Sequence, residues 1–274
     1  MNVKDDGQPD DSRRVPAAAE GEVGVRAVDP ALTTDTALFL DVDGTLLDIA
    51  ERPGSVSIPA PLVSALARAE ERLCGAVALV SGRTIDEIDR LFSPLRLRAS
   101  GVHGAEMRLD PEEEPRVAPT AHALPESLTD LVADSLRAFP GLLVEQKTYS
   151  LAVHYRGAPE TGPQVRAILQ RVLDSEPHGG IAIFDAHCAF ELRLPGFDKG
   201  GAITTFLKNE PFVGRIPIFV GDDTTDEAGF AVVAARGGGA YAVGGWRPGA
   251  NGVFEDPKAV RAWLMAFANE RRPA

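Results

Sequence analysis

Short apolar runs alternate with segments of helical periodicity along most of this chain of 274 residues. Four apolar runs are typical of buried strands, at 37–40, 76–80, 216–220 and 240–243. Four segments carry apolar residues at helical spacing, at 60–73, 84–92, 225–235 and 257–269. Because strands alternate with helices, the pattern predicts an α/β fold with a parallel sheet covered by helices on both faces.

The middle of the chain has a different pattern. Two helical segments alternate with two pairs of strand-like runs, at 124–139, 142–147, 150–156, 164–175, 181–184 and 188–194. The second pair is predicted to turn at Asp185, Ala186 and His187. The pattern predicts a smaller α+β cap domain at 109–193, inserted into a core made of 34–108 and 194–274. Residues 1–33 have no apolar period and are predicted to form a disordered tail.

Composition excludes several kinds of partner. The net charge of -12 argues against nucleic acid, because phosphate backbones are bound by clustered lysine and arginine. Cys74 and Cys188 form no metal-binding pair and are expected to be free thiols in a reducing compartment. The sequence has no signal peptide pattern and no run of ~18 apolar residues. We therefore expect a cytoplasmic protein, not associated with membranes, and a monomer.

Asp41 directly follows the first apolar run, and Asp43 lies two residues further along the chain. The carboxyl ends of strands are where open α/β sheets bind ligands, and alternate strand residues face the same side. Both carboxylates are therefore predicted to point into one cleft, where Mg²⁺ would offset their repulsion. The alternative is an acidic turn with no chemical role, to which Gly44 would also contribute its conformational freedom.

Two further motifs would suit a phosphate group. Ser81, Gly82 and Arg83 lie between an apolar run and a helix, where a hydroxyl, a glycine backbone and a helix N-terminus can bind phosphate. Such residues are also common in ordinary helix caps. Lys199 lies in a glycine-rich turn before a helix predicted to open at Ala202, and its ammonium group could reach a phosphate oxygen.

The segment after the run 216–220 contains four acidic residues within six positions, Asp222, Asp223, Asp226 and Glu227. Mutual repulsion makes this arrangement costly unless a cation is present. The alternative is an acidic first turn that complements a helix dipole, which would explain Asp226 and Glu227. It explains Asp222 and Asp223 poorly, because these two follow the strand immediately.

In this order, the motifs resemble those of the haloacid dehalogenase (HAD) phosphatases. The resemblance covers the whole core and implies a Rossmann-like parallel sheet with an inserted cap. It implies that Asp41 is the nucleophile that forms an aspartyl-phosphate, and that Asp43 is the general acid and base. Ser81 and Lys199 would hold the transferring phosphoryl group, which fits a reaction that depends on positioning and charge neutralisation.

The same resemblance implies a Mg²⁺ cofactor. Its ligands would be the Asp41 carboxylate, the Asp43 backbone carbonyl and Asp222. Either Asp223 or Asp226 would support the metal from beside these ligands.

Several segments resemble the trehalose-phosphate phosphatase family in particular, at 101–106, 144–147, 151–156 and 191–196. The Ser-Gly-Arg-Thr and Gly-Asp-Asp-Thr-Thr-Asp-Glu motifs match that family too, and the resemblance runs from residue 36 to the end. It implies that the substrate is a sugar phosphate, trehalose 6-phosphate. The residues expected to contact it are Gly82, Arg83, His103, Glu106, Glu145, Lys147, Arg156, Glu191 and Arg193.

Charged residues alternate along three predicted strands, as Glu145 with Lys147, His154 with Arg156, and Glu191 with Arg193. Each pair shares a face of its strand and could hydrogen-bond sugar hydroxyls. The alternative is a solvated sheet face with cross-strand ion pairs. His103 and Glu106 could likewise brace a hinge instead of contacting substrate.

Other functions fit parts of the same sequence. A phosphatase acting on sucrose 6-phosphate or a mannosyl phosphate would keep every core motif, and a phosphomutase would keep both aspartates. A catalytically silent HAD domain that binds a partner is disfavoured, because Asp41, Asp43, Lys199 and Asp222 are all present.

Overall fold

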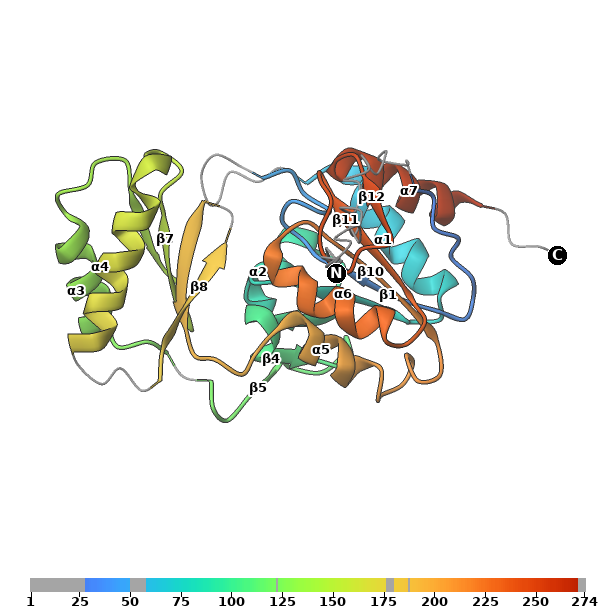
Figure 1. Ribbon diagram of the computed structural model, residues 1–274. Helices are drawn as coiled ribbons and strands as arrows, with labels where there is room; N and C mark the ends of the chain where they lie inside the picture. Colours follow the sequence, from blue (N-terminus) through green and yellow to red (C-terminus); the bar gives the residue numbers. More distant parts are fainter. Residues whose placement is uncertain (1–27, 50–57, 122, 176–179, 187, 271–274) are drawn as a thin grey trace, which may run out of the picture.

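The computed structural model describes residues 28–49, 58–121, 123–175, 180–186 and 188–270. These residues form two β-sheets, one of eight strands and one of four. The eight-stranded sheet and its helices are called the core here, and the four-stranded sheet and its helices are called the cap. The two bodies lie side by side, with the cap at the left of Figure 1.

The core sheet has the order β12-β11-β10-β1-β2-β3-β4-β5. Its strands are β1 (Thr36–Leu40), β2 (Val77–Val80), β3 (Arg98–Gly101), β4 (Glu106–Arg108), β5 (Arg116–Val117), β10 (Ile216–Gly221), β11 (Gly239–Val243) and β12 (Gly252–Phe254). Every pairing from β12 to β3 is parallel, and β4 and β5 extend the sheet antiparallel. The apolar runs of β1 and β2 are fully buried, and that of β10 is buried after Ile216, which confirms the prediction of a largely parallel α/β sheet.

Helices cover this sheet. They are α1 (Ala60–Arg72), α2 (Ile85–Phe92), α5 (Lys199–Phe206), α6 (Glu227–Ala234) and α7 (Pro257–Asn269), with short 3₁₀ turns η1 (Val102–Gly104) and η3 (Thr224–Asp226). The helices predicted from periodicity are present, with bounds that differ by a few residues. β3, β4, β5 and β12 were not predicted, because they are too short or too polar to stand out as apolar runs.

The cap is an antiparallel sheet with two helices on one face (Figure 1). Its order is β6-β7-β9-β8, from the strands β6 (Leu143–Gln146), β7 (Ser150–His154), β8 (Ala182–Ala186) and β9 (Ala189–Arg193). The helices are α3 (Glu126–Leu136) and α4 (Gly162–Ser175), with the 3₁₀ turn η2 (Pro159–Thr161). Asp185 and Ala186 were predicted to form a turn but pair with Phe190 and Ala189, so β8 is longer than predicted.

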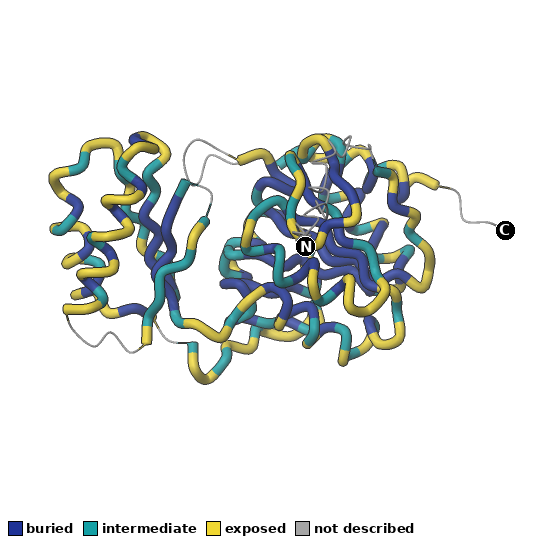
Figure 2. The backbone as a smooth tube through the Cα atoms, viewed as in Figure 1, coloured by how far each residue is buried: buried dark blue, intermediate teal, exposed yellow. Residues whose placement is uncertain are grey.

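Alternation along the cap strands gives the sheet two different faces. Leu151, Val153, Phe190 and Leu192 belong to the apolar cluster formed with α3 and α4. Glu191, which lies between two of these residues, must then face the other side. Figure 2 shows the buried interior of each body as dark segments flanked by exposed ones. The polar side of the cap sheet therefore faces the core.

Two predicted boundaries differ from the structure. β5 belongs to the core sheet although it lies within the range 109–193 predicted for the cap, and the first cap helix begins only at Glu126. Order also begins before residue 34, because Val28 and Leu32 pack on the core and the Trp263 indole N–H donates to the Pro30 carbonyl at 2.9 Å. Residues 1–27 of the predicted tail lie outside the described residues.

Within the described ranges, none of the helices combines the length and apolar character that a membrane span requires.

Candidate active site

The predicted motifs converge because their strands are neighbours. β1 lies between β10 and β2, and all three run parallel. Their carboxyl ends therefore meet at one edge of the sheet. Asp41 follows β1 there, Ser81 follows β2, and Asp222 follows β10.

Lys199 connects two carboxylates at this edge. Its Nζ atom lies 2.8 Å from Oδ1 of Asp41 and 2.6 Å from Oδ1 of Asp226. Asp41 and Lys199 are almost completely buried, and Asp226 is completely buried. Charge-assisted contacts in such a dry setting hold the three side chains in a fixed arrangement.

Lys199 lies on a helix and not in the turn that the sequence predicted. Helix α5 begins at Lys199, one turn before the predicted start at Ala202. The Asp198 carboxylate caps it by accepting a 2.7 Å hydrogen bond from the Gly201 N–H. The cap fixes the first turn, and with it the direction of the lysine.

Asp41, Asp222 and Asp226 form the group of carboxylates that could hold a metal ion, since one oxygen of each lies within 4.8 Å of the others. Gly44 makes room for this group, because a Cβ atom there would lie 2.1 Å from Oδ2 of Asp222. Thr45 steadies Asp222 with a hydroxyl contact of 3.3 Å to Oδ1.

The structure distinguishes Asp223 from Asp226, either of which was expected to support the metal. The Asp223 side chain caps η3 by accepting from the Thr224 N–H at 2.7 Å. Asp226, for which a solvated helix turn was the alternative, contacts Lys199 and belongs to the group of acids that could hold a metal. The chain turns after β10, so that Asp226, the fifth residue beyond Gly221, comes back to the strand end, while Asp223 lines the cavity outside the group of three carboxylates.

The cluster carries more negative than positive charge. Burial raises the pKa of Asp41 well above its usual range; Lys199 opposes this, and Asp226 and Asp222 add to it. Burial and the charge of Asp226 raise the pKa of Asp222 to about 6. Burial would lower the pKa of Lys199, but Asp226 and Asp41 outweigh it and raise that pKa. One ammonium group thus faces three carboxylates, a charge that a divalent cation would balance.

Asp43 lies beside this cluster and forms a bidentate ion pair with Arg83. The Nε and Nη2 atoms of Arg83 each lie 2.6 Å from one oxygen of Asp43. Asp43 nevertheless keeps 41% of its side chain exposed. The capping role considered for the Ser-Gly-Arg-Thr motif belongs to Thr84, whose hydroxyl accepts from the Glu87 N–H. Ser81 and Gly82 are therefore available to the cleft.

A cavity of about 420 Å³ lies between the core and the cap, a volume within the usual range for small-molecule sites. Core residues on its wall include Asp41, Asp43, Ser81, Gly82, Arg83, His103, Lys199, Asp222 and Asp223. Cap residues on its wall include Glu145, Lys147, His154, Arg156 and Glu191. Most of the residues predicted from the two parts of the chain thus meet around one space.

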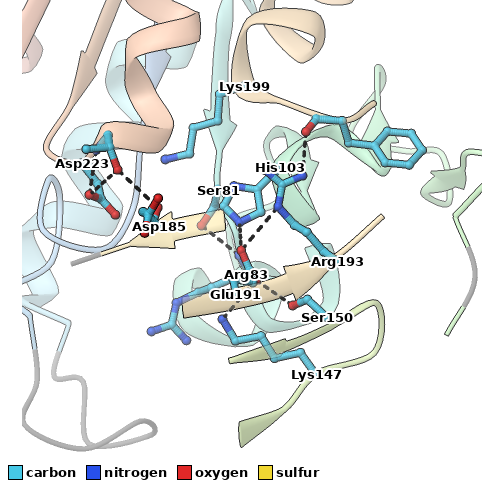
Figure 3. Close-up of polar contacts among 12 residues, drawn as sticks. Ser81, Arg83, His103, Lys147, Ser150, Asp185, Glu191, Arg193, Lys199 and Asp223 are labelled. Carbon is cyan, nitrogen blue, oxygen red and sulfur yellow. Dashed lines mark hydrogen bonds and ion pairs between the residues drawn. The ribbon is translucent and has the colours of Figure 1, made fainter. Parts of the chain in front are cut away.

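Glu191 is the most highly connected of the charged cap residues just described, as Figure 3 shows. Its Oε1 accepts from the Ser150 hydroxyl at 2.6 Å, and its Oε2 lies 2.9 Å from Nε2 of His103. Lys147 lies 3.9 Å away and Arg193 3.6 Å away. Burial would raise the pKa of Glu191, but His103, Lys147 and Ser150 hold it well below its usual range.

Glu145 pairs with His154 across the neighbouring strands, with 2.9 Å between Oε2 and Nε2. This hydrogen bond lowers the pKa of Glu145. Cross-strand pairs, the alternative considered for these charges, therefore exist. They lie on the wall of the cavity and not on an open sheet face.

Two residues expected to contact substrate are turned elsewhere. Glu106 is buried and accepts from the Ile85 N–H at 2.7 Å, so it braces the start of α2. Arg193 lies over the Phe184 ring, 3.7 Å from its centroid, and donates to the Phe197 carbonyl at 2.8 Å. Neither is among the described residues that line the cavity. Strand alternation correctly placed Arg193 beside Glu191, with 3.6 Å between Nε and Oε2, but the guanidinium group extends toward Phe184 and Phe197 and does not line the cavity.

Sequence reasoning also missed Ser150, the cap hydroxyl that holds Glu191. A signal was available, because Ser150 lies at even spacing from His154 and therefore on the same face of β7.

Comparison with known proteins agrees with this geometry. The trehalose-phosphatase family model matches residues 39–243. Trehalose-6-phosphate phosphatase of Escherichia coli (strain K12) is 34% identical over 235 residues, which are 86% of this chain and 87% of that protein. A relative from Sinorhizobium fredii (strain NBRC 101917 / NGR234) is 38% identical over 243 residues, covering 87% of this chain and 91% of its own.

Among solved structures, a trehalose-6-phosphate phosphatase related protein superposes with a TM-score of 0.67 at 27% identity, covering 84% of this chain and 96% of its own. The fold is thus that of the HAD phosphatases with a cap. The matching family model spans both the catalytic cluster and the cap, and the chain belongs to the trehalose-phosphatase family.

Proposed function

We propose that this protein is a phosphatase that hydrolyses trehalose 6-phosphate to trehalose and phosphate. The observation that carries the proposal is the cavity between the two bodies. One wall offers a buried nucleophile, a lysine and acids, and the other offers charged hydrogen-bonding groups. A phosphorylated disaccharide needs both walls, the first for its phosphoryl group and the second for its hydroxyls.

In the first step, a carboxylate oxygen of Asp41 attacks phosphorus, and the bond from phosphorus to the sugar oxygen breaks. Asp43 donates a proton to the departing sugar oxygen. In the second step, water gives a proton to Asp43 and attacks the aspartyl-phosphate, which releases phosphate and restores Asp41. Lys199 and Ser81 hold the phosphoryl oxygens in both steps.

Arg83 determines when Asp43 can act. Both oxygens of Asp43 accept an N–H group of Arg83, so Arg83 must release one oxygen before that oxygen can face the departing sugar oxygen. Burial would lower the pKa of Arg83, but the hydrogen bond and charge of Asp43 raise it, and the charge of Glu145 in the cap adds to this effect.

The carboxylate group fits Mg²⁺, a hard cation that prefers oxygen ligands. Asp41, Asp222 and Asp226 would hold it, together with the backbone carbonyl of Asp43. When bound, the metal neutralises charge on the transferring phosphoryl group. Asp226 replaces Asp223 in this proposal because its oxygen lies within the group.

Glu145, Lys147 and Glu191 are proposed to bind the sugar hydroxyls, with Arg156 beside them on the cap wall. We further infer a cytoplasmic monomer. The two cysteines are both free, in agreement with a reducing compartment. Size-exclusion chromatography with light scattering tests the monomeric state.

The test of function is phosphate release from trehalose 6-phosphate, sucrose 6-phosphate and glucose 6-phosphate, each with Mg²⁺ and with a chelator. The expected result is Mg²⁺-dependent turnover with the highest kcat/KM for trehalose 6-phosphate. Faster turnover of sucrose 6-phosphate would assign the alternative substrate. A folded protein that releases phosphate from none of the three would support a silent regulatory domain.

A further inference from the structure

The cap touches the core through Glu191, and the partners of this residue are unequal. Ser150, Lys147 and Arg193 belong to the cap itself. Among the described partners of Glu191, His103 alone comes from the core. Each carboxylate oxygen thus has a close partner on a different body, Ser150 at Oε1 and His103 at Oε2 (Figure 3).

His103 is held in place by its own backbone. The His103 N–H donates to the Ser81 carbonyl at 3.0 Å, and the Val102 N–H donates to the Arg83 carbonyl at 2.9 Å. Val102 and His103 both adopt positive φ angles, of 49° and 56°. Non-glycine residues rarely adopt this conformation unless the surroundings require it. The loop that carries the imidazole is therefore fixed to the phosphate-binding corner.

Gly82 makes the position of the ring possible. A Cβ atom at residue 82 would lie 2.9 Å from both Cε1 and Nε2 of His103. Gly82 thus lines the cavity and also packs against the His103 imidazole, which contacts the cap. A side chain there would move Nε2, the atom that contacts Glu191.

We infer that His103 is a positioning residue that ties Glu191 of the cap to the phosphate-binding corner at Ser81. It acts through Glu191 and needs no contact of its own with the substrate. The inference rests on the proposed function, in which Glu191 binds sugar hydroxyls. The tie places Glu191 at a set distance from the phosphoryl group bound at Ser81. Only substrates whose sugar hydroxyls lie at that distance from their phosphoryl group can then contact both sites.

The imidazole geometry supplies matched variants. Nε2 contacts Glu191, whereas the buried Nδ1 atom has no hydrogen-bond partner among the described residues. Glutamine can place its amide near Nε2, and asparagine can place its amide only near Nδ1. Asparagine accepts positive φ more readily than glutamine does. A purely structural role would thus favour His103→Asn, and the tie would favour His103→Gln.

The kinetic experiment compares kcat/KM for trehalose 6-phosphate and p-nitrophenyl phosphate in wild type, His103→Gln and His103→Asn. For His103→Asn we expect a loss on the order of 10²-fold with trehalose 6-phosphate, since small misplacements have effects of this size, and a much smaller loss with the other ester. His103→Gln should recover most of the difference. Equal losses on the two esters, or His103→Asn matching or exceeding His103→Gln, would overturn the inference.

A second measurement uses no substrate. Cys74 lies in the core and Cys188 in the cap, and both thiols are free for spin labels. The distance distribution between the labels should be narrow in wild type and His103→Gln, and broader or longer in His103→Asn. An unchanged distribution in His103→Asn would refute the tie. If the wild-type protein did not hydrolyse trehalose 6-phosphate, the proposed function would be refuted. The distance measurement would still show whether His103 ties the cap to the core.

Discussion

Asp226 illustrates how one residue can hold a cluster of buried charges together. Its completely buried carboxylate lies 2.6 Å from Nζ of Lys199 and belongs to the group that could hold a metal. Removing one member of a buried ion pair leaves the other charge without compensation. Asp223, three residues earlier, instead caps a short turn. Two aspartates of one motif therefore provide a natural comparison.

We predict that Asp226→Asn lowers kcat by roughly 10²-fold or more on any phosphate ester, because Lys199 and the metal both lose a carboxylate. Asp223→Asn should change kcat and the unfolding free energy little, because asparagine caps a helix about as well as aspartate does. Steady-state kinetics and urea denaturation of both variants measure these effects. A larger loss of kcat in Asp223→Asn would return the metal site to the assignment first expected from the sequence.

Asp41→Asn tests the nucleophile. An amide replaces the attacking oxygen with little change in shape, so we expect turnover to fall by about 10⁴-fold or more while the fold persists. Phosphate release and circular dichroism check the two parts of this prediction. Near-normal activity of Asp41→Asn would contradict the covalent mechanism.

At the scale of elements, strand alternation gives the cap sheet one face for packing and another for the cavity. Its apolar face binds α3 and α4, and its polar face lines the cavity. The groups proposed to bind the phosphoryl group lie on the core wall of the same cavity. Binding energy from the sugar and reaction at phosphorus can thus be varied separately.

We predict that Glu145→Ala and Lys147→Ala each lower kcat/KM for trehalose 6-phosphate by about 10- to 100-fold, the value of a hydrogen bond to a charged group. p-Nitrophenyl phosphate is too small to reach the cap and should be little affected. Lys199→Ala should impair both esters.

Asp134→Ala and Arg137→Ala are the matched controls for this comparison. These two residues form an exposed ion pair at the end of α3, on the far side of the cap, and should leave both rates unchanged. If the Glu145 and Lys147 variants behaved like these controls, the charged face would have no role in binding. Equal losses on both esters would instead assign these residues to catalysis.

At the scale of the whole molecule, the acid cluster links metal binding to stability. Burial and Asp226 raise the pKa of Asp222 to about 6. A carboxyl group whose pKa is higher in the folded than in the unfolded state stabilises the fold at low pH. This contribution disappears as the pH rises through the folded value. The metal-free protein therefore holds unfavourable negative charge at neutral pH.

We predict that Tm measured in EDTA falls as the pH rises from about 4 to about 6, and that Mg²⁺ restores it at pH 7 by binding the folded state alone. The gain from Mg²⁺ should shrink below about pH 6, where protons compete for Asp222. Asp222→Asn should flatten the profile in EDTA and reduce the Mg²⁺ effect. A Mg²⁺ effect that is independent of pH would exclude this link.

The sequence by itself determined the core fold and the positions of the catalytic motifs. Apolar runs such as 37–40 and 217–220 are buried on both faces of a parallel sheet, and this requirement is local to the run. Asp41, Ser81 and Asp222 each follow an apolar run, and the family resemblance assigned them to one site. The structure showed that β1 lies between β2 and β10, which is why the three residues meet at one edge.

Only the tertiary structure decided which neighbours each side chain meets. β3 to β5 are strands because the sheet edge offers them hydrogen bonds, and their own composition does not require it. Asp226 reaches Lys199 and Asp223 does not, because a turn after β10 reverses the chain between them. His103 meets Glu191 only where the cap approaches the core. Contacts between residues far apart in sequence depend on the path of the chain, which periodicity and spacing do not specify.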